Sequence, residues 1–357
     1  MKTIKERDLE RLSDYTRVLY RKPDLRHLFL ELTLRCNAHC FHCGSSCTPF
    51  SGGDELTLEE YRSLLLSVKE DFDISRILLC ITGGEPLLRP DFFEIMSMAR
   101  DLGFHWGMTS NGTLITKDVA HRLAECGMST ISISIDGLRE THDELRGMPG
   151  GYDRAMEGIQ NLIDEKAFRA VQVTSVFNHR NIRELDELFS VMDGLDIDSW
   201  RVINLEPIGR ALERPDLMCT KEDYRRLFDF IREKRREGYP VLYGCSHYLG
   251  LEYEVEVRNW YWLCNAGVHT ASVMANGDIG ACLDIERRPD LVQGNVRTDR
   301  FSEVWRDRFS PFRHDLSDEN EECRACSHRA FCRGDAHHSW DYDVKKPMLC
   351  MKGILFD

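Results

Sequence analysis

Short apolar runs alternate with amphipathic stretches between residues 27 and 208 of the chain. Six of the runs have the length and composition of buried β-strands, and they cover residues 27–34, 76–83, 104–110, 130–136, 170–177 and 199–207. Between the runs, apolar residues recur every three or four positions, which is the period of a helix with one buried face. These helical stretches read LTLEEYRSLLLSVKE, PDFFEIMSMARDLG, TKDVAHRLAECG, YDRAMEGIQNLIDEK and NIRELDELFSVMDG.

Residues at the ends of the helical stretches agree with this division. Thr57, Thr116 and Asn181 are of types that cap helix N-termini, and Gly103 and Gly127 suit helix C-termini. Repeated strand–helix units predict parallel strands joined by right-handed crossovers. Six units are too few for a closed eight-stranded barrel, so we predict an α/β fold with an open, partial (β/α)6 TIM-like barrel. Functional residues are then expected on the loops that follow the strands.

The pattern changes after Pro207. A charged helical stretch, KEDYRRLFDFIREKRREG, leads into a segment with few long helical patterns and many cysteines. We therefore predict four parts: a helical extension (1–26), the partial barrel (27–215), a connecting helix (216–244) and a smaller cysteine-rich α+β domain (245–357).

Composition narrows the class of protein. The chain has 357 residues, of which 42% are hydrophobic, so it can bury a sizeable core. Its net charge of −13 argues against non-specific nucleic-acid binding, which needs basic residues to neutralise phosphates. No apolar run reaches the roughly 18–20 residues needed to span a bilayer. The charged N-terminus has no apolar signal-peptide core, so we expect a cytoplasmic location.

Fourteen cysteines then need an explanation, because disulfides are rare in a reducing cytosol. Four lie between Cys36 and Cys47, and six lie between Cys264 and Cys350. Cytosolic cysteines at such short spacings are typical of metal ligands.

The sequence CNAHCFHC places Cys36, Cys40 and Cys43 just after the first predicted strand. Three thiolates on one loop suit a four-iron cluster with one iron left free of protein ligands. The alternative is zinc, which prefers four closed ligands. A side chain such as His39, His42 or Cys47 would complete that site.

The Cx3Cx2C spacing at the end of a first barrel strand resembles the radical S-adenosylmethionine (SAM) superfamily. The resemblance implies a [4Fe-4S] cluster on Cys36, Cys40 and Cys43 whose open iron chelates the amino and carboxylate groups of SAM. Reduction then cleaves the sulfonium and yields a 5′-deoxyadenosyl radical. The family usually has an aromatic residue before the last cysteine; here it is His42, whose imidazole is expected to pack against adenine.

Further segments fall where this family places its SAM contacts. In ITGGEP, the resemblance implies close backbone approach to the ligand at Gly83 and Gly84, and an acceptor for the SAM amino group at Glu85. In TSNG, Ser110 and Asn111 are expected to bond ribose or to line the site. Ser134 in SISIDG resembles the ribose or carboxylate contact. Arg146 matches the arginine that pairs with the SAM carboxylate, which suits a guanidinium fork.

The C-terminal cysteines resemble the SPASM extension, which carries two auxiliary four-iron clusters. Cys264 and Cys282 flank NGD, a hairpin signal. The resemblance implies a distal cluster on four cysteines, namely Cys323, Cys326, Cys332 and Cys350. The proximal cluster keeps Cys264 and Cys282.

The proximal set departs from the family at Ala336, where a cysteine is usual. Four residues are candidates to replace it: Cys245, Asp335, His337 and His338. A shorter "twitch" arrangement, with Cys264, Cys282, Cys323 and Cys326 around one cluster, and zinc in a ribbon-like fold are the alternatives. One or two auxiliary clusters are thus expected.

The function implied is an oxidoreductase that abstracts a hydrogen atom from its substrate. The expected substrate is a peptide that undergoes maturation by crosslinking, epimerisation or oxidation. The alternatives are a small molecule, such as a tetrapyrrole side chain or a sugar, and a non-catalytic iron–sulfur electron carrier or sensor. The enzyme interpretation also implies a low-potential electron donor of the flavodoxin or ferredoxin type.

Overall fold

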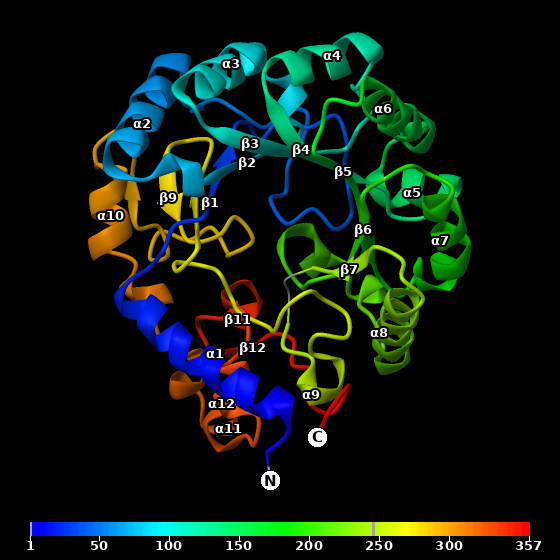
Figure 1. Cartoon of the computed structure of the whole chain (residues 1–357), viewed down its shortest axis with the longest axis vertical. Helices are drawn as coiled ribbons and strands as arrows, with labels where there is room; N and C mark the ends of the chain where they lie inside the picture. Colours follow the sequence, from blue (N-terminus) through cyan, green and yellow to red (C-terminus); the bar gives the residue numbers. More distant parts are fainter. Residues whose placement is uncertain (1, 245–246) are drawn as a thin grey trace.

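The computed structural model describes residues 2–244 and 247–357. Within them, the main sheet has ten strands in the order β10-β9-β8-β1-β2-β3-β4-β5-β6-β7. The ladders from β8 through β1 to β7 are parallel, whereas β9 and β10 pair antiparallel. The sheet curves into an incomplete ring with helices on its outer side (Figure 1). The partial-barrel prediction is therefore confirmed.

All six predicted strands are present. They are β1 His27–Glu31, β2 Leu78–Thr82, β3 His105–Ser110, β4 Met128–Ser134, β5 Ala170–Phe177 and β6 Ser199–Asn204. The predicted helices are α1 Ile4–Arg21, α2 Leu58–Asp71, α3 Phe92–Leu102, α4 Lys117–Glu125, α6 Gly151–Glu165, α7 Leu185–Asp193 and α8 Lys221–Arg236. One further helix after β4, α5 Arg139–Arg146, was not expected.

Local capping explains most of these helix ends. Thr57 forms a reciprocal capping box with Glu60 at the start of α2, and the Thr116 side chain caps α4. Gly103 ends α3 in the left-handed conformation, with φ of 95°. Asn181 does precede a 3-10 turn, Ile182–Glu184, that leads into α7, but its side chain does not cap this turn, because its amide donates to the Asp136 and Val176 carbonyls.

The sheet continues beyond the six predicted strands at both edges. On one side, β7 Val241–Tyr243 adds to β6. On the other, β8 Thr270–Val273 pairs parallel with β1, and β9 Asp278–Gly280 follows through the predicted hairpin turn. Strand β10 Gly294–Asn295 completes this edge. The cysteine-rich segment is thus joined to the barrel by main-chain hydrogen bonds.

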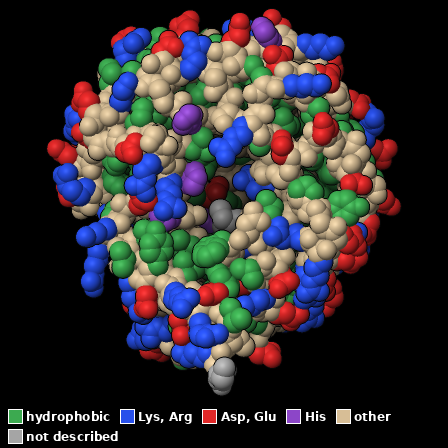
Figure 2. Space-filling model, in the orientation of Figure 1, with side chains coloured by type: hydrophobic (Ala, Val, Ile, Leu, Met, Phe, Trp, Pro, Cys, Tyr) green, Lys and Arg blue, Asp and Glu red, His purple; other side chains and the backbone are tan. Residues whose placement is uncertain are grey.

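The rest of the C-terminal segment consists of short elements. They are α9 Gly250–Tyr253, α10 Phe301–Asp307, α11 Glu321–Ala325, α12 Arg329–Cys332, β11 Trp340–Asp341 and β12 Lys346–Pro347. In space-filling form, the face seen in Figure 1 is hollowed near its centre, with histidine, lysine and arginine side chains around the hollow (Figure 2). In residues 2–244 and 247–357, no helix is both long and apolar enough to cross a bilayer.

Candidate active site

The cysteine loop after β1 is buried and held by main-chain hydrogen bonds. Cys36 and Cys40 are buried, and Cys43 is half-buried. The backbone N–H groups of His39 and Phe41 donate to the last carbonyls of α5, each at 2.9 Å. Burial raises the pKa of Cys36 to about 12. Because iron binds the thiolate, a bound cluster would supply the positive charge that this buried thiol lacks.

An arginine after β6 holds the same loop from the opposite side. Arg210 Nε donates to the Cys40 carbonyl at 2.8 Å, and Nη1 donates to the Cys47 carbonyl at 2.7 Å. Its backbone N–H donates to the Cys43 carbonyl at 3.1 Å. No sequence signal marked Arg210, because its partners lie more than 160 positions earlier in the chain.

The two glycines of ITGGEP pack against the start of the cysteine loop. Gly84 N–H donates to the Thr33 carbonyl at 2.7 Å, and Glu85 N–H donates to the Arg35 carbonyl at 2.8 Å. A Cβ atom on Gly84 would lie 2.6 Å from the Arg35 carbonyl carbon and 3.0 Å from Cys36 Cβ. A Cβ on Gly83 would likewise collide with the Thr33 carbonyl oxygen. Both positions thus require glycine because they approach the backbone that leads into Cys36.

The Glu85 carboxylate is fully buried and connects two strand ends. Both its oxygens lie 3.0 Å from Ser110 Oγ, and Oε2 accepts from the Asn111 N–H at 2.9 Å. Burial raises the pKa of Glu85 to about 7, although these hydrogen bonds oppose the effect. Asn111 also donates to Asn37 in the cysteine loop at 2.8 Å. The TSNG turn therefore joins ITGGEP to the cysteine loop.

A second buried carboxylate, Asp136, joins the end of β4 to the cysteine loop. Its Oδ2 accepts from Arg146 Nε at 2.6 Å and lies 3.0 Å from His42 Nε2. Burial alone would raise the pKa of Asp136, but Arg146 and His42 outweigh burial and hold the pKa far below its usual range. Ser134, two residues earlier, is also buried.

Arg146 therefore has protein partners at the site where a ligand carboxylate was expected. Besides Asp136, its Nη1 lies 3.7 Å from Cys40 Sγ. This arrangement places a fixed positive charge beside a cluster cysteine. Sequence reasoning quoted SISIDG but gave Asp136 no role, since its partners lie on other loops.

The fourth cysteine of the loop contacts the third. Cys47 N–H donates to Cys43 Sγ at 3.4 Å. A hydrogen bond from the Cys47 side chain lowers the pKa of Cys43 to about 5, and the same contact raises the pKa of Cys47. Cys43 is thus the thiol of this pair that ionises first. Its thiolate is the form that binds iron.

The zinc alternative would need a fourth ligand such as His39, His42 or Cys47 beside the three cysteines. His42 Nε2 is already engaged by Asp136. Over the described ranges, no group of three or more Cys, His, Asp or Glu side chains is arranged around a single metal ion. A four-iron cluster does not require such convergence, because each thiolate binds a different iron.

The four cysteines of the expected distal cluster lie near one another. Burial, together with the neighbouring thiolates of Cys350 and Cys326, raises the pKa of Cys323 to about 11. Burial, Asp335 and Cys350 likewise raise the pKa of Cys332. Crowded thiols that oppose one another's ionisation suit a shared cationic cluster.

Tyr342 lies near the expected proximal cysteines. Both Cys264 and Cys282 interact electrostatically with Tyr342, and the Tyr342 hydroxyl lies 2.9 Å from His337 Nδ1. Ala336 is fully buried in an apolar cluster that also contacts Cys264.

The four replacement candidates near Ala336 differ in their contacts. Asp335 has both oxygens engaged, by His247 Nδ1 at 2.6 Å and by the Tyr248 N–H at 2.9 Å. His337 Nδ1 lies 2.9 Å from the Tyr342 hydroxyl, whereas the ring of His338 lies 6.3 Å from that of His247. Cys245 lies outside the described residues.

A cavity of about 620 Å³ lies between the end of β1, on the cysteine-loop side of the barrel, and the C-terminal segment. Its walls come from the end of β1, the 52–55 loop, the β8–β9 turn and residues 287–292. Arg287 crosses between the two sides, because it pairs with Glu31 at the end of β1 and donates to Ser45 Oγ at 3.0 Å. The cavity therefore lies beside the cysteine loop.

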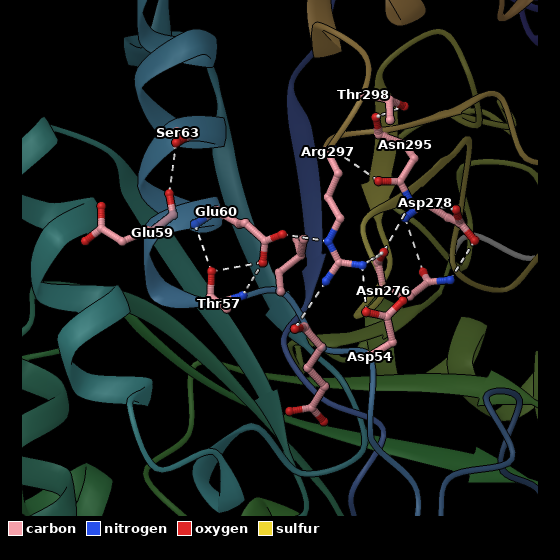
Figure 3. A network of polar contacts seen from close by, with 12 residues as sticks. Asp54, Thr57, Glu59, Glu60, Ser63, Asn276, Asp278, Asn295, Arg297 and Thr298 are labelled. Carbon is pink, nitrogen blue, oxygen red and sulfur yellow. Dashed lines mark hydrogen bonds and ion pairs between the residues drawn. The ribbon is translucent and has the colours of Figure 1, made fainter.

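A network around Arg297 fixes one wall of this cavity (Figure 3). Arg297 Nε donates to Glu60 at 2.6 Å, and Nη1 donates to Asp54 at 2.7 Å and to the Asn276 carbonyl at 3.3 Å. Glu60 also accepts from the Thr57 N–H at 2.7 Å. One guanidinium thus connects the β8–β9 turn to the N-terminus of α2.

Two family models match the chain. The radical SAM superfamily matches residues 30–192, and an iron–sulfur cluster-binding domain, SPASM, matches residues 264–327. The chain is 31% identical to an AdoMet-dependent heme synthase of Methanosarcina barkeri, over 85% of this chain and 89% of the relative. It is 32% identical to the mycofactocin maturase MftC of Mycobacterium tuberculosis, over 85% of this chain and 76% of that relative.

The fold is also that of a solved structure. Streptococcus suis SuiB, bound to its precursor peptide SuiA, superposes with a TM-score of 0.71 at 18% identity, covering 91% of this chain and 74% of that one. The family matches imply a four-iron cluster, bound SAM and C-terminal auxiliary iron–sulfur ligation. The chain belongs to the radical SAM superfamily and is an enzyme with a SPASM-type iron–sulfur domain at its C-terminal end.

Proposed function

We propose that this enzyme reductively cleaves SAM at a cluster held by Cys36, Cys40 and Cys43, and abstracts a hydrogen atom from a substrate bound beside that loop. One observation carries the proposal. The loops after four other strands, β2, β3, β4 and β6, converge on the buried cysteine loop, which is held by Arg210, Asn111 and the C-terminus of α5. A non-catalytic electron carrier has no need for such a polar pocket around one cluster.

The four-iron cluster and SAM, when bound, would supply the radical chemistry, because the reduced cluster cleaves SAM to a 5′-deoxyadenosyl radical. The chain's own residues position and shield it. Gly83 and Gly84 let the backbone pack onto the loop, and Glu85 fixes the strand ends through Ser110 and Asn111. Ser134, Arg146 and His42 are the remaining proposed SAM contacts, and Arg146 holds positive charge next to Cys40.

For the auxiliary region, we propose a distal cluster on Cys323, Cys326, Cys332 and Cys350. Cys264 and Cys282 are the proposed ligands of a proximal one. Among the described candidates near Ala336, Asp335 and His337 both have protein partners, so neither is favoured over the other as the completing ligand. The division of the chain at residues 215 and 244 stays a prediction.

Two substrate classes have specific support. A peptide, matured by crosslinking, epimerisation or oxidation, is supported by the similarity to the mycofactocin maturase. A tetrapyrrole is supported by the similarity to the heme synthase, which spans 89% of that relative, and by the cavity of about 620 Å³, a volume typical of small-molecule sites. A low-potential electron donor in the cytoplasm completes the proposal.

The test uses the anaerobically reconstituted holoenzyme with dithionite and SAM. Separate reactions receive iron coproporphyrin or short peptides encoded beside the gene, and mass spectrometry follows substrate and 5′-deoxyadenosine together. We expect one class to change mass in step with 5′-deoxyadenosine formation. Cleavage of SAM without change in either class would refute both substrate proposals but leave the radical chemistry standing.

A further inference from the structure

A buried arginine beside the auxiliary cysteines has an unpaired side chain in the part of the chain that the structure describes. Arg333 follows Cys332 directly and is only 5% exposed. It forms no ion pair with the described residues, and its Nη1 atom is buried without a hydrogen bond. A buried guanidinium without an anion is costly, because it loses its hydration and gains no attraction in return. The arginine therefore needs a negatively charged partner other than the protein's own carboxylates.

The same arginine lines a small cavity between the two sets of auxiliary cysteines. Cys264, a proposed proximal ligand, and Cys332, a proposed distal ligand, lie on the walls of this cavity together with Trp262. Trp262 is 2% exposed, and its Nε1 atom is a second buried donor without a partner. A guanidinium and an indole N–H can donate hydrogen bonds but cannot accept them. Both orphaned atoms thus require an acceptor close to these cysteines.

The carboxylates nearest to the cavity in the fold are engaged elsewhere. Asp335 lines the cavity, but its oxygens contact His247 Nδ1 at 2.6 Å and the Tyr248 N–H at 2.9 Å. Asp315 accepts from the hydroxyl of Tyr20, another lining residue, at 3.0 Å. Neither carboxylate forms an ion pair with the arginine, so neither balances its charge.

The backbone holds Arg333 in this place. The residue ends α12 in the left-handed conformation, with φ of 56°, and its carbonyl accepts from the Ser317 N–H at 3.0 Å. A Cβ atom on the next residue, Gly334, would lie 2.4 Å from the Ser317 nitrogen. A non-glycine residue stays in the left-handed region only where its surroundings hold it there. The arginine thus belongs to a tightly packed turn directly after an auxiliary cysteine.

We propose that Arg333 and Trp262 donate hydrogen bonds to the sulfur atoms of an auxiliary four-iron cluster, and that Arg333 balances part of the negative charge of that cluster. This inference rests on the auxiliary clusters of the proposed function and gives a role to two residues that are not iron ligands. A four-iron cluster held by thiolates is an anion, and hydrogen bonds to its sulfurs tune its reduction potential. Reduction adds one negative charge, so both contacts favour the reduced form and raise the potential.

The test uses the whole chain with Cys36, Cys40 and Cys43 replaced by alanine and reconstituted anaerobically, because only auxiliary iron then gives a signal. A redox titration followed by electron paramagnetic resonance gives the midpoint potential. In this parent protein, Arg333→Met should raise the ratio of oxidised to reduced cluster about tenfold at a given solution potential, the size expected for one hydrogen bond to a charged group. That ratio corresponds to a midpoint lower by about 59 mV for a one-electron couple. Trp262→Phe keeps the ring packing and should shift the midpoint in the same direction by less.

Matched controls remove the same groups where they face solvent. Arg329→Met deletes a guanidinium at the start of α12 that pairs with Asp318 and is 43% exposed. Trp260→Phe deletes an indole N–H from a side chain that is 64% exposed. Neither control should move the midpoint. Arg333→Lys keeps the charge but loses the planar fork, so it should retain part of the potential.

Adding Cys264→Ala to the parent protein identifies the cluster that accepts these hydrogen bonds. If the shift caused by Arg333→Met persists in this background, the acceptor is the cluster of Cys332. If the signal that shifts is lost together with Cys264, the acceptor is the proximal cluster.

Midpoints equal to that of the parent protein in both Arg333→Met and Trp262→Phe, with iron retained, would overturn the inference, because the two donors would then bind only a buried water. Absence of iron from the parent protein would instead refute the auxiliary clusters of the proposed function. If Arg333→Met retains no iron, urea unfolding of the cluster-free protein decides the matter. Its unfolding midpoint should be no lower than that of the cluster-free parent, because an unpaired buried charge has been removed. A lower midpoint would show that Arg333 has a partner within the protein and would also overturn the inference.

Discussion

Gly84 gives a direct test of how the ITGGEP segment supports the cysteine loop. In Gly84→Ala, the new Cβ would lie 2.6 Å from the Arg35 carbonyl carbon and 3.0 Å from Cys36 Cβ. Ordinary carbon contacts are about 3.5–4.0 Å, so the loop must move by about 1 Å. Overpacking of this kind costs about 1–3 kcal/mol. The same movement weakens two adjoining hydrogen bonds, Gly84 N–H to the Thr33 carbonyl and Glu85 N–H to the Arg35 carbonyl, and costs about 1 kcal/mol of stability for each.

We therefore expect Gly84→Ala to lower the free energy of unfolding by about 3–5 kcal/mol and to lose about four of the bound irons. Urea unfolding of the cluster-free protein and iron analysis after reconstitution measure the two effects. Gly194→Ala is the matched control, because that glycine has a φ of −78° and its nearest foreign atoms would lie 3.5 Å from a Cβ. If the two variants had equal stability and iron content, the proposed support of Cys36 by Gly84 would be wrong.

Three further predictions concern pH, the Arg297 network and the auxiliary iron. The folded-state pKa of Glu85, about 7, is raised above its ordinary 4.5, so its ionisation costs stability as pH rises between these values. Relative to Glu85→Gln, the cluster-free protein should lose about 3 kcal/mol between pH 4 and pH 8 in urea unfolding, and a constant difference would contradict this. Arg297→Ala should cost only about 1 kcal/mol, because its ion pairs are partly exposed. It should, however, speed amide exchange at Leu56, whose N–H donates to the Ala275 carbonyl, and unchanged exchange would oppose the proposed wall-fixing role. Iron analysis of the triple alanine variant of the Cys36–Cys43 motif should find about eight irons, whereas about four would leave a single auxiliary cluster and stoichiometric zinc would favour a ribbon site.

The strands were predictable because short runs rich in apolar and β-branched residues, bounded by turn residues and separated by helical patterns, are typical of parallel strands. The unexpected helix α5 shows the limit of that signal. Its sequence, RETHDELR, is dominated by charged residues, and it buries only Thr141, His142 and Leu145. Burial against the cysteine loop, rather than local pattern, stabilises it. The pairing of β8 with β1 was likewise invisible, because more than 240 residues separate the paired positions.

Site residues could be predicted where their chemistry follows from their spacing in the sequence. Residues that act through contacts with distant loops could not. The cysteine spacing and the ITGGEP, TSNG and SISIDG turns identified loops that the fold brings together. The residues that orient them, Asp136 and Arg210, act through partners on other loops. The unpaired Nη1 of Arg333 could be recognised only in the folded chain, which brings it to one cavity with Cys264 and Trp262.

Reductive cleavage of SAM tests the central claim most directly. Anaerobic protein is incubated with dithionite and SAM, and 5′-deoxyadenosine is quantified by chromatography. The unaltered enzyme should form it, the triple alanine variant at Cys36, Cys40 and Cys43 should form none while retaining its other iron, and Cys126→Ala, outside both cysteine groups, should remain active. Continued formation of 5′-deoxyadenosine by the triple variant would contradict the assignment of the radical cluster to this loop.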